Sequence, residues 1–432
     1  MQMNNNDVIV SLDIGTTKVV AIVGKKNEHG KIEILGVGKT HSPGVKRGIV
    51  TNISETSDAI SIAIQKAETA SSMELTQKVN VGIAGQHINS IQHRGIRTRQ
   101  NADDVITQED VDMLIEDMHK LVMLPGEKII HVLPQEYIID GEQGITKPIG
   151  MSGVRLEANF HIITGQETAK NNIVRCVKRS GLDVADLILE PLASAEAVLE
   201  SEEKEGGVAL IDIGGGTTDI AIFYDNVIRH TAVIPFGGSV ITEDIKEGCA
   251  ILRNQAEKLK VTFGSALADY AKDNVNVSIP GIAGADPKEI SVKNLSAIIQ
   301  ARMSEILEYA FHEIKNSGYS EKLIAGIVLT GGGSQLKHIA QLCEYVTGIR
   351  ARVGYPNQHL AQTENEEIAS PLFSTGVGLV IKGFEALESE NKKVKNKVTG
   401  HSTKKRGSFF DNWLFKPAEK FFDDQDIDNV EE

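Results

Sequence analysis

The sequence predicts an α/β fold in which one structural unit occurs twice, with the two copies facing each other across a cleft. The first observation is a loop sequence present in two copies, at residues 13–18 and 212–219. The second is that strand-forming residues precede and follow each copy, as in a β-hairpin. The third is a pair of matched helix starts, Glu190-Pro191-Leu192-Ala193-Ser194 and Ser370-Pro371-Leu372-Phe373-Ser374, each with Pro at the first helical position.

The repeated loop has the composition of a phosphate-binding turn. Gly and Thr leave room for backbone N–H groups to converge on phosphate oxygens, and the hydroxyls add further donors. A single Asp-x-Gly sequence is equally well an ordinary turn, but two copies between strands favour the binding role. We expect phosphate contacts from Gly15, Thr16, Thr17, Lys18, Gly214, Gly215, Gly216, Thr217 and Thr218. Asp13 and Asp212 should lie near Mg²⁺ and contact it through water.

The helix starts and a late glycine turn complete the expected site. Ala193, Ala195 and Ala197 on one helix, with Gly376 and Gly378 on the other, would let two helices cross closely beneath the cleft. The turn Gly331-Gly332-Gly333 follows an apolar run from Ile324 to Leu329 and precedes a helix with Leu336, Ile339, Ala340 and Cys343 on one face. A strand, a glycine turn and a helix N-terminus form a place where a nucleotide can approach backbone.

These motifs resemble those of the actin, sugar-kinase and heat-shock-chaperone ATPase superfamily. Within it, residues 151–158, Met-Ser-Gly-Val-Arg-Leu-Glu-Ala, resemble the segment that closes the inserted subdomain of FtsA, the family of bacterial cell-division actin homologues. The resemblance covers about residues 7 to 384. It implies a duplicated actin-like ATPase fold that binds ATP and Mg²⁺. It also implies self-association into filaments, contacts with FtsZ and other division proteins, and a peripheral position on the cytoplasmic face of the membrane at the septum.

The resemblance also suggests the domain boundaries. The first core subdomain is expected at 1–78 and 163–203, with an inserted α+β subdomain at 79–162. The second core subdomain is expected at 204–239 and 319–384, with a smaller helical subdomain at 240–318. The insertion contains strand-like segments at 79–84, 128–133 and 155–164 and a helix from about Thr107, but no acid–base pair. It is either an interaction surface, as in FtsA, or a purely structural module.

Two helical segments of the second half carry candidate contacts. Residues 256–260, Ala-Glu-Lys-Leu-Lys, resemble the helix with which bacterial actins contact the nucleoside, so Glu257 and Lys260 are candidates for ribose and base contacts. Asn254 and Glu257 also have the spacing of a capping box, which is an alternative role for Glu257. Farther on, residues 301–306 resemble the FtsA helix that receives the C-terminal peptide of FtsZ, which makes Arg302 and Lys293 partner-binding candidates.

The C-terminal segment predicts a tether. Residues 385–407 are polar and lysine-rich and are expected to form a flexible basic linker. Residues 408–423 have the pattern of an amphipathic membrane helix, although Pro417 and several acidic residues are poorly suited to anionic lipid. A helix that packs on the protein or a partner is the alternative. The residues expected to enter the membrane are Phe409, Phe410, Trp413, Leu414 and Phe421.

Composition excludes other classes. The net charge of −14 argues against a nucleic-acid-binding protein. No apolar run is long enough to span a bilayer, and residues 1–7 lack a signal-peptide core. Cys176, Cys249 and Cys343 have no metal-ligand spacing and are expected as buried thiols of a cytosolic protein.

Three functions remain in view. A sugar kinase should have a substrate cleft with an Asp base and no aromatic tail. A pilus-assembly actin homologue would share the inserted subdomain and lack the terminal helix. A membrane-tethered division adaptor accounts for both features. Whether ATP is hydrolysed is left open; Glu190 could position an attacking water, or it could simply open the helix before Pro191.

Overall fold

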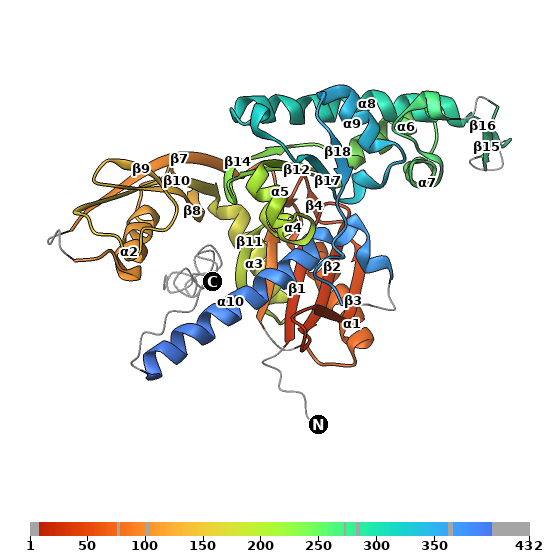
Figure 1. Ribbon diagram of the computed structural model, residues 1–432. Coiled ribbons are helices and arrows are strands. Elements are labelled where there is room, and N and C mark those ends of the chain that lie inside the picture. Colours follow the sequence, from red (N-terminus) through yellow and green to blue (C-terminus); the bar gives the residue numbers. More distant parts are fainter. Residues whose placement is uncertain are drawn as a thin grey trace.

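The computed structural model describes residues 8–75, 78–99, 104–271, 274–281, 286–361 and 366–399. It contains two five-stranded core sheets with the same topology, joined by two helices that cross between them (Figure 1). The predicted actin-like duplication is therefore confirmed at the level of strand order.

The first core sheet has the order β3-β2-β1-β6-β11. The strands β1, β2 and β3 form an antiparallel meander, while β6 and β11 are parallel to β1. Their bounds are β1 Val8–Ile14, β2 Lys18–Lys26, β3 Ile32–His41, β6 Lys78–Ile83 and β11 Asp183–Leu189. Every residue of β1 is buried because helices cover both faces of the sheet, which explains its unbroken apolar sequence.

The second core sheet repeats this order as β14-β13-β12-β17-β18. Again three strands form an antiparallel meander and two continue in parallel. The bounds are β12 Val208–Ile213, β13 Thr218–Tyr224, β14 Val227–Ile234, β17 Gly326–Thr330 and β18 Ala351–Val353. Both predicted hairpins, β1–β2 and β12–β13, are present, and each places its loop at the same edge of its sheet.

The helices follow the predicted pattern in most places. The helix α1 begins after Asn52, whose side chain accepts a hydrogen bond from the Glu55 backbone N–H at 3.2 Å, a contact typical of a helix N-cap. In the second half, α8 buries one face at helical spacing. The helices of the core and the smaller subdomain are α1 Ile53–Ser71, α3 Glu167–Arg179, α4 Glu190–Val198, α5 Ser201–Gly206, α6 Gly238–Cys249, α7 Arg253–Phe263, α8 Val292–Asn316, α9 Ile339–Thr347 and α10 Ser374–Thr399. Two short ladders complete the described strands. The strand β4 Val45–Lys46 pairs with β5 Ile49–Val50 in the first half, and β15 Asn276–Ile279 pairs with β16 Lys288–Ser291 in the smaller subdomain of the second half.

The helices α4 and α10 cross at very close range between the two sheets. A Cβ atom added to Gly378 would lie only 1.8 Å from the carbonyl oxygen of Ala193, so the two backbones touch there as the small residues predict. Gly376 instead packs against Ile22 of β2. The buried Lys382 ammonium of α10 adds an ion pair across the crossing, 2.9 Å from Glu196 of α4. The Lys204 ammonium, 2.7 Å from Glu196, and the Lys382 ammonium together hold the pKa of the Glu196 carboxyl well below its usual range despite its burial.

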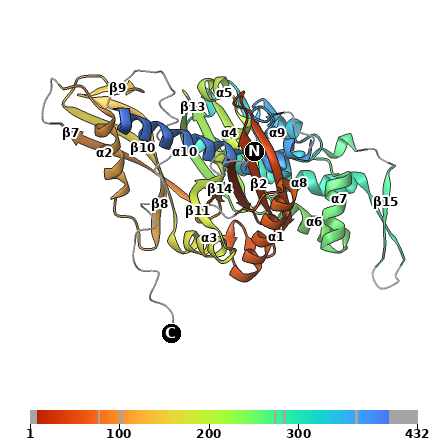
Figure 2. The same cartoon turned by 90° about the horizontal axis from the view of Figure 1, so that it is seen from below.

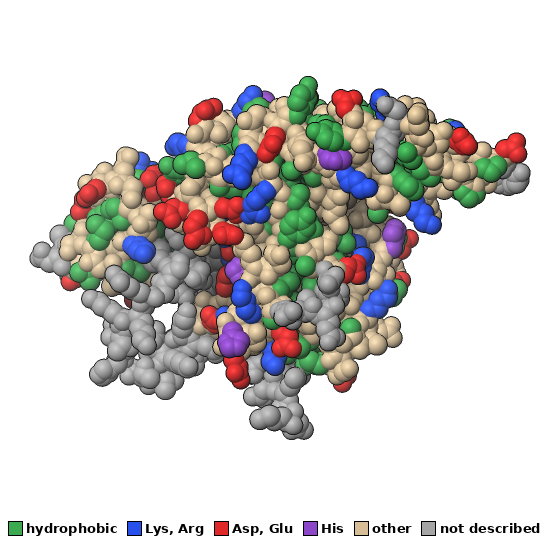
Figure 3. All heavy atoms as spheres, turned by 45° about the vertical axis from the view of Figure 1, so that its right-hand side comes forward, with side chains coloured by type: hydrophobic (Ala, Val, Ile, Leu, Met, Phe, Trp, Pro, Cys, Tyr) green, Lys and Arg blue, Asp and Glu red, His purple; other side chains and the backbone are tan. Residues whose placement is uncertain are grey.

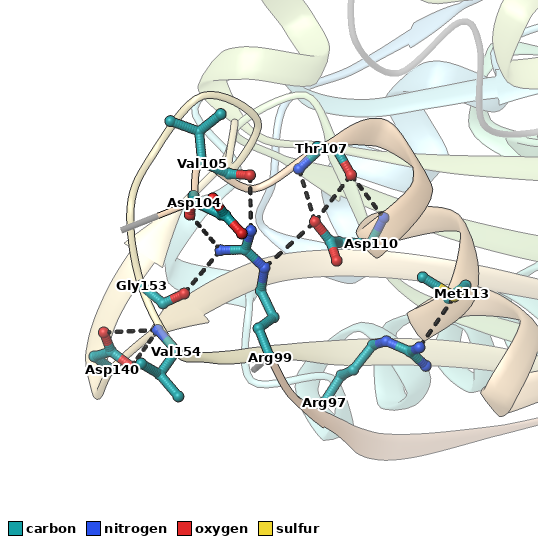
Figure 4. A network of polar contacts seen from close by, with 10 residues as sticks. All are labelled: Arg97, Arg99, Asp104, Val105, Thr107, Asp110, Met113, Asp140, Gly153 and Val154. Atoms are coloured by element: carbon teal, nitrogen blue, oxygen red, sulfur yellow. Dashed lines mark hydrogen bonds and ion pairs between the residues drawn. The ribbon is translucent and has the colours of Figure 1, made fainter. Parts of the chain in front are cut away.

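The inserted subdomain is a four-stranded sheet of order β7-β10-β8-β9 covered by one helix on one face (Figures 1 and 2). Its elements are β7 Asn89–Thr98, α2 Gln108–His119, β8 Glu127–Ile139, β9 Glu142–Ile145 and β10 Arg155–Gln166. Arg99 joins the segments that precede α2 and β10. Its guanidinium donates to the carbonyl oxygens of Asp104, Val105 and Gly153 at 2.8–2.9 Å (Figure 4). Gly153 belongs to the segment that pointed to this subdomain in the sequence.

Two predicted boundaries are wrong. The strand expected to open the insertion, residues 79–84, is β6, which pairs with β1 and β11 inside the core sheet. Its fully buried apolar run is typical of such a position. The flexible linker expected from Glu385 does not begin there, because α10 continues to Thr399. Lysine and glutamate are good helix formers, so a charged sequence can extend an existing helix.

Cys176, Cys249 and Cys343 are buried and free, as expected. Among the described residues, no helix is both long and apolar enough to span a membrane. On the face shown in Figure 3, Lys and Arg side chains are interspersed with Asp and Glu. The expected membrane residues Phe409, Phe410, Trp413, Leu414 and Phe421 lie outside the described part of the chain.

Candidate functional site

The two repeated loops form the same turn. In the first loop, the Gly15 backbone N–H donates to the Lys18 carbonyl at 2.9 Å, and in the second, Gly214 donates to Thr217 at the same distance. This bond closes the hairpin so that the residues between its two ends project from the edge of the sheet. The sequence duplication therefore corresponds to a duplicated backbone conformation.

The two loops also contact each other, one from each half of the molecule. A Cβ atom at Gly215 would lie 2.4 Å from Thr17 Cγ2, and one at Gly216 would lie 2.3 Å from Thr16 Oγ1. Both distances are far inside van der Waals contact, so the glycines are required by the approach of the opposite loop. Thr16 is held in turn by the Gly48 backbone N–H, which donates to its hydroxyl at 3.2 Å.

The third glycine turn packs on the second loop. Gly331 has φ +81°, and a Cβ there would lie 2.2 Å from Asp212 Oδ1. Gly333 approaches Ile213 just as closely, while Gly332 faces Leu372. The helix expected directly after this turn begins later, because a 3₁₀ turn occupies Gly332–Gln335 and α9 starts only at Ile339. The predicted proximity of this turn to the second loop is nevertheless present.

Asp13 and Asp212 lie at the ends of β1 and β12, where their different partners distinguish the two halves. The Lys18 ammonium lies 2.6 Å from the Asp13 carboxylate. Among the described residues no Lys or Arg forms an ion pair with Asp212, which instead accepts a hydrogen bond from the Ser194 hydroxyl of α4 at 2.6 Å. Burial raises the pKa of Asp212, and the nearby Asp13 raises it further.

Two more carboxyl groups share this buried region. Asp219 lies opposite Asp212 in the β12–β13 ladder, and Thr217 donates to its Oδ2 at 2.9 Å. Its Oδ1 is buried with no hydrogen-bond partner, and burial together with Asp212 raises the pKa of Asp219 to about 8. Glu190, the first residue of α4, has its pKa raised well above its usual range by burial and by Asp13, Asp219 and Asp212.

This cluster of four carboxyl groups is suited to a cation. Buried carboxylates repel one another and cannot all ionise without compensating positive charge, and Lys18 supplies only one such charge. A divalent cation would relieve the repulsion and satisfy Asp219 Oδ1. No three His, Cys, Asp or Glu side chains in the described part of the chain are arranged as direct ligands. The donor set therefore fits Mg²⁺, which keeps several waters, better than an ion that needs a full protein cage.

Glu257 and Lys260 lie beside the second loop and are bonded to each other. The Lys260 ammonium donates to Glu257 at 2.8 Å and to the Gly238 carbonyl at 2.9 Å. Gly238 opens α6, and its backbone N–H donates to the Gly214 carbonyl of the loop at 2.9 Å. The Glu257–Lys260 pair is therefore connected to the second loop through Gly238. Burial lowers the pKa of the Lys260 ammonium.

The alternative capping role of Glu257 is wrong. Asn254 lies inside α7, which begins at Arg253, and is not the residue before the helix. The carboxamide oxygen of Gln255 instead accepts from the Leu252 backbone N–H at 3.0 Å.

The partner-binding candidates lie on α8, away from the loops. Arg302 donates to both carboxylate oxygens of Asp244 on α6, at 2.5 and 3.0 Å, and also to Glu305. These contacts raise the pKa of Arg302, with the Asp244 hydrogen bond as the largest cause. Lys293 lies in the first turn of the same helix. The guanidinium charge of Arg302 is therefore already balanced within the chain.

Sequence reasoning missed three residues of the site. Asp219, Ser194 and Thr375 were not expected to contribute, yet they surround Asp212. Thr375 lies 3.0 Å from Ser194 and 3.5 Å from Asp212. A signal was available, because Asp219 ends the repeated motif and the matched helix starts supply both hydroxyls.

Comparison with known proteins agrees with this architecture. Residues 209–378 match the family described as cell division protein FtsA, and residues 85–164 match the SHS2 domain inserted in FtsA. A cell division protein FtsA from Pseudomonas aeruginosa is 39% identical over 383 residues, covering 89% of this chain and 91% of that protein.

Solved structures share the fold at low identity. The PilM-PilN type IV pilus biogenesis complex aligns with a TM-score of 0.60 at 15% identity, over 87% of this chain and 98% of that one. MreB 5 of Spiroplasma citri bound to AMPPNP aligns with a TM-score of 0.54 at 15% identity, over 91% and 100%.

Proposed function

The chain belongs to the FtsA family of cell division proteins, and on this premise we propose that it binds ATP between its halves and anchors FtsZ filaments to the membrane. The observation that carries the nucleotide proposal is the meeting of two identical turns, at Thr16–Thr17 and Gly215–Gly216, over a cluster of buried carboxyl groups. MreB 5 of Spiroplasma citri, which shares the fold and was solved bound to AMPPNP, supports the same use of the fold.

The phosphates would be held by the backbone and hydroxyls of the two loops. The donors are Gly15, Thr16, Thr17 and Lys18 in the first loop and Gly214, Gly215, Gly216, Thr217 and Thr218 in the second. The turn at Gly331–Gly333 and the Glu257–Lys260 pair would face the nucleoside. Since these two side chains now bond each other, a ribose or base contact requires them to exchange that bond for one with the ligand.

Mg²⁺ would accompany the nucleotide near Asp13 and Asp212, with Asp219 as a further acceptor. When bound, the ion supplies positive charge for phosphate and carboxylates. In the present arrangement burial and three neighbouring carboxylates raise the pKa of Glu190 well above its usual range, which favours its protonated form. It could position water only after those charges are compensated. We therefore propose that turnover is weak and that ATP mainly controls the state of the polymer.

The proposed partner contacts are based on the family assignment and on the charged residues of α8. The C-terminal peptide of FtsZ would approach Arg302 and Lys293, and its acidic groups would compete with Asp244 and Glu305 for the guanidinium. Such a charge-assisted exchange predicts binding that weakens as salt increases. Other division proteins would use the inserted subdomain, which exposes apolar side chains such as Val122 and Leu124.

The membrane contact is proposed for residues 408–423. One amphipathic helix gives modest affinity, because it buries one face and must be ordered on binding. Assembly into filaments would place many helices side by side and raise avidity by about 10²–10⁴. This arrangement would keep the protein peripheral, on the cytoplasmic face at the septum. The family assignment favours this function over the pilus-assembly adaptor, whose structural likeness is at 15% identity.

One experiment tests nucleotide, partner and membrane together. Purified protein is mixed with FtsZ, anionic vesicles, Mg²⁺ and either ATP or no nucleotide, and the vesicles are sedimented. We expect FtsZ in the pellet only with ATP and the full-length chain. The Asp212→Ala variant tests the nucleotide, Arg302→Glu the partner, and deletion of 408–432 the membrane. FtsZ recruitment that survives all three changes would contradict the proposal.

A further inference from the structure

The inserted subdomain contacts both halves of the molecule. By chain connection it belongs to the first half, since it lies between β6 and α3. Its side chains nevertheless reach β14, the edge strand of the second core sheet. The Gln135 carboxamide donates to the carbonyl oxygens of Ile228 and Arg229 at 2.8 and 3.1 Å. In Figure 1, β7, β8 and β10 extend from the side of β14.

A buried histidine adds a second contact with β14. His161 Nε2 lies 2.9 Å from the Thr231 hydroxyl, and its Nδ1 lies 3.0 Å from the Gln92 carboxamide nitrogen. Because that amide nitrogen can only donate, Nδ1 is the acceptor and Nε2 carries the proton. Burial lowers the pKa of His161 to about 4, so this neutral tautomer persists at physiological pH. These polar contacts lie beside apolar ones, because Ile228 of β14 belongs to the same buried apolar cluster as Leu133 of β8 and Ile163 of β10.

The same subdomain is bonded to the first half beside Glu190. His131 Nε2 accepts the backbone N–H of Leu189 at 3.1 Å in a buried position. Leu189 ends β11 and directly precedes Glu190, the first residue of α4. His131 and Gln135 lie four residues apart on β8. One strand of the insertion is therefore attached to both sides of the cleft.

The contact between the insertion and β14 is linked through strand pairing to the second loop. The edge strand β14 pairs along its length with β13, and β13 pairs with β12. These last two strands carry the loop from Asp212 to Asp219. A shift of this loop relative to the first half must therefore move β14 against the insertion.

We propose that the inserted subdomain is a clamp whose bonds to β14 are energetically coupled to nucleotide binding in the cleft. The inference rests on the proposed binding of ATP between the halves. A nucleotide that fixes the two halves in one arrangement strengthens the contacts of Gln135 and His161. Coupling is reciprocal, so a partner that binds the insertion and alters these contacts changes nucleotide affinity by the same factor.

The test compares Gln135→Ala with the matched control Gln108→Ala in the full-length chain. Gln108 lies exposed at the start of α2, where its amide donates to Asp112 of the same helix. ATP affinity is measured by titration with fluorescent ATP and Mg²⁺. Hydrogen exchange is measured by mass spectrometry for peptides covering 89–98 and 127–139, with and without saturating ATP.

We expect ATP to slow exchange in both peptides of the wild type and of Gln108→Ala. In Gln135→Ala this slowing should be lost, and the dissociation constant for ATP should rise by about fivefold or more. Wild-type protein that binds ATP with no change in these peptides would overturn the clamp while leaving the proposed function intact. If Gln135→Ala binds ATP as tightly as the wild type, the clamp is likewise overturned and the proposed function stands. If the wild type binds no ATP in the titration, the proposed function fails first.

Discussion

Replacing Gly378 by alanine tests whether the close crossing of α4 and α10 sets the packing between the two halves. The added Cβ would lie 1.8 Å from the Ala193 carbonyl oxygen and 2.3 Å from its carbonyl carbon. Ordinary contacts begin near 3.4 Å, so the helices must separate by roughly 1.5 Å, as expected for backbone that cannot rotate away. Alanine is intrinsically better than glycine in a helix by about 1 kcal/mol, which offsets part of the cost.

The matched control is Gly376→Ala, two residues earlier in the same helix. Its added Cβ would meet the Ile22 Cδ1 atom at 2.6 Å, and the tip of a side chain can move aside. Both variants gain the same helix propensity, so their difference isolates the backbone contact. Overpacking costs about 1–3 kcal/mol and occasionally more. We expect Gly378→Ala to be less stable than Gly376→Ala by about 2 kcal/mol.

Urea unfolding followed by circular dichroism measures this difference, and fluorescent-ATP titration reports its effect on the cleft. Because the crossing lies beneath Asp212, we also expect weaker ATP binding in Gly378→Ala. If Gly378→Ala unfolds at the same urea concentration as Gly376→Ala, the crossing is looser than described and this reasoning is refuted.

Four further predictions follow from the site and its surroundings. Asp212→Ala should lower ATP affinity strongly, and unchanged affinity in both Asp212→Ala and Thr217→Ala by titration would remove the second loop from the site. Because the pKa of Asp219 is raised to about 8, the folded chain binds a proton that the unfolded chain has lost. Asp219 alone should therefore make the free energy of unfolding of the nucleotide-free protein fall as pH rises from about 4 to 8, by at most about 1.4 kcal/mol per unit. Asp219→Asn should lose this one contribution, so its slope in urea titrations at several pH values should be less negative than that of the wild type, and an unchanged slope would refute the assignment. Arg302→Glu should abolish binding of the FtsZ peptide in fluorescence anisotropy while ATP binding persists, and retained peptide affinity would exclude this site. Deletion of 408–432 should prevent co-sedimentation with anionic vesicles, with Trp413→Glu nearly as severe; lipid binding that survives the deletion would show another anchor.

Local motifs predicted the two turns and the close helix crossing correctly. The turns at Gly15 and Gly214 and the crossing at Gly378 follow directly from small residues at fixed positions, because only such residues permit the observed approach of two backbones. The two hairpins followed from strand patterns on either side of a glycine turn. What these features share is that the deciding interactions are close in sequence or fixed by steric exclusion.

Long-range partners were harder to predict. Residues 79–84 read equally well as the start of an insertion or as a core strand, because a buried apolar run does not reveal its neighbours. Arg302 was expected to offer free charge, yet Asp244, 58 positions earlier, neutralises it. Asp219 was missed because its unusual chemistry comes from burial beside Asp212, and burial depends on the whole fold.

The long helix α10 connects the buried carboxyl cluster to the start of the C-terminal segment. Thr375 in its first turn touches Asp212, while its far end at Thr399 leads to the C-terminal segment, and the helix projects from the core in Figure 1. Its 26 residues span about 39 Å at 1.5 Å per residue. The helix packs on the first core sheet as far as Phe384, so it moves together with that half. A rotation of the first half by about 5° about the first turn of α10 would move the far end by roughly 3 Å over that length. A small change of domain angle at the carboxylate would thus become a larger displacement where the proposed tether would begin.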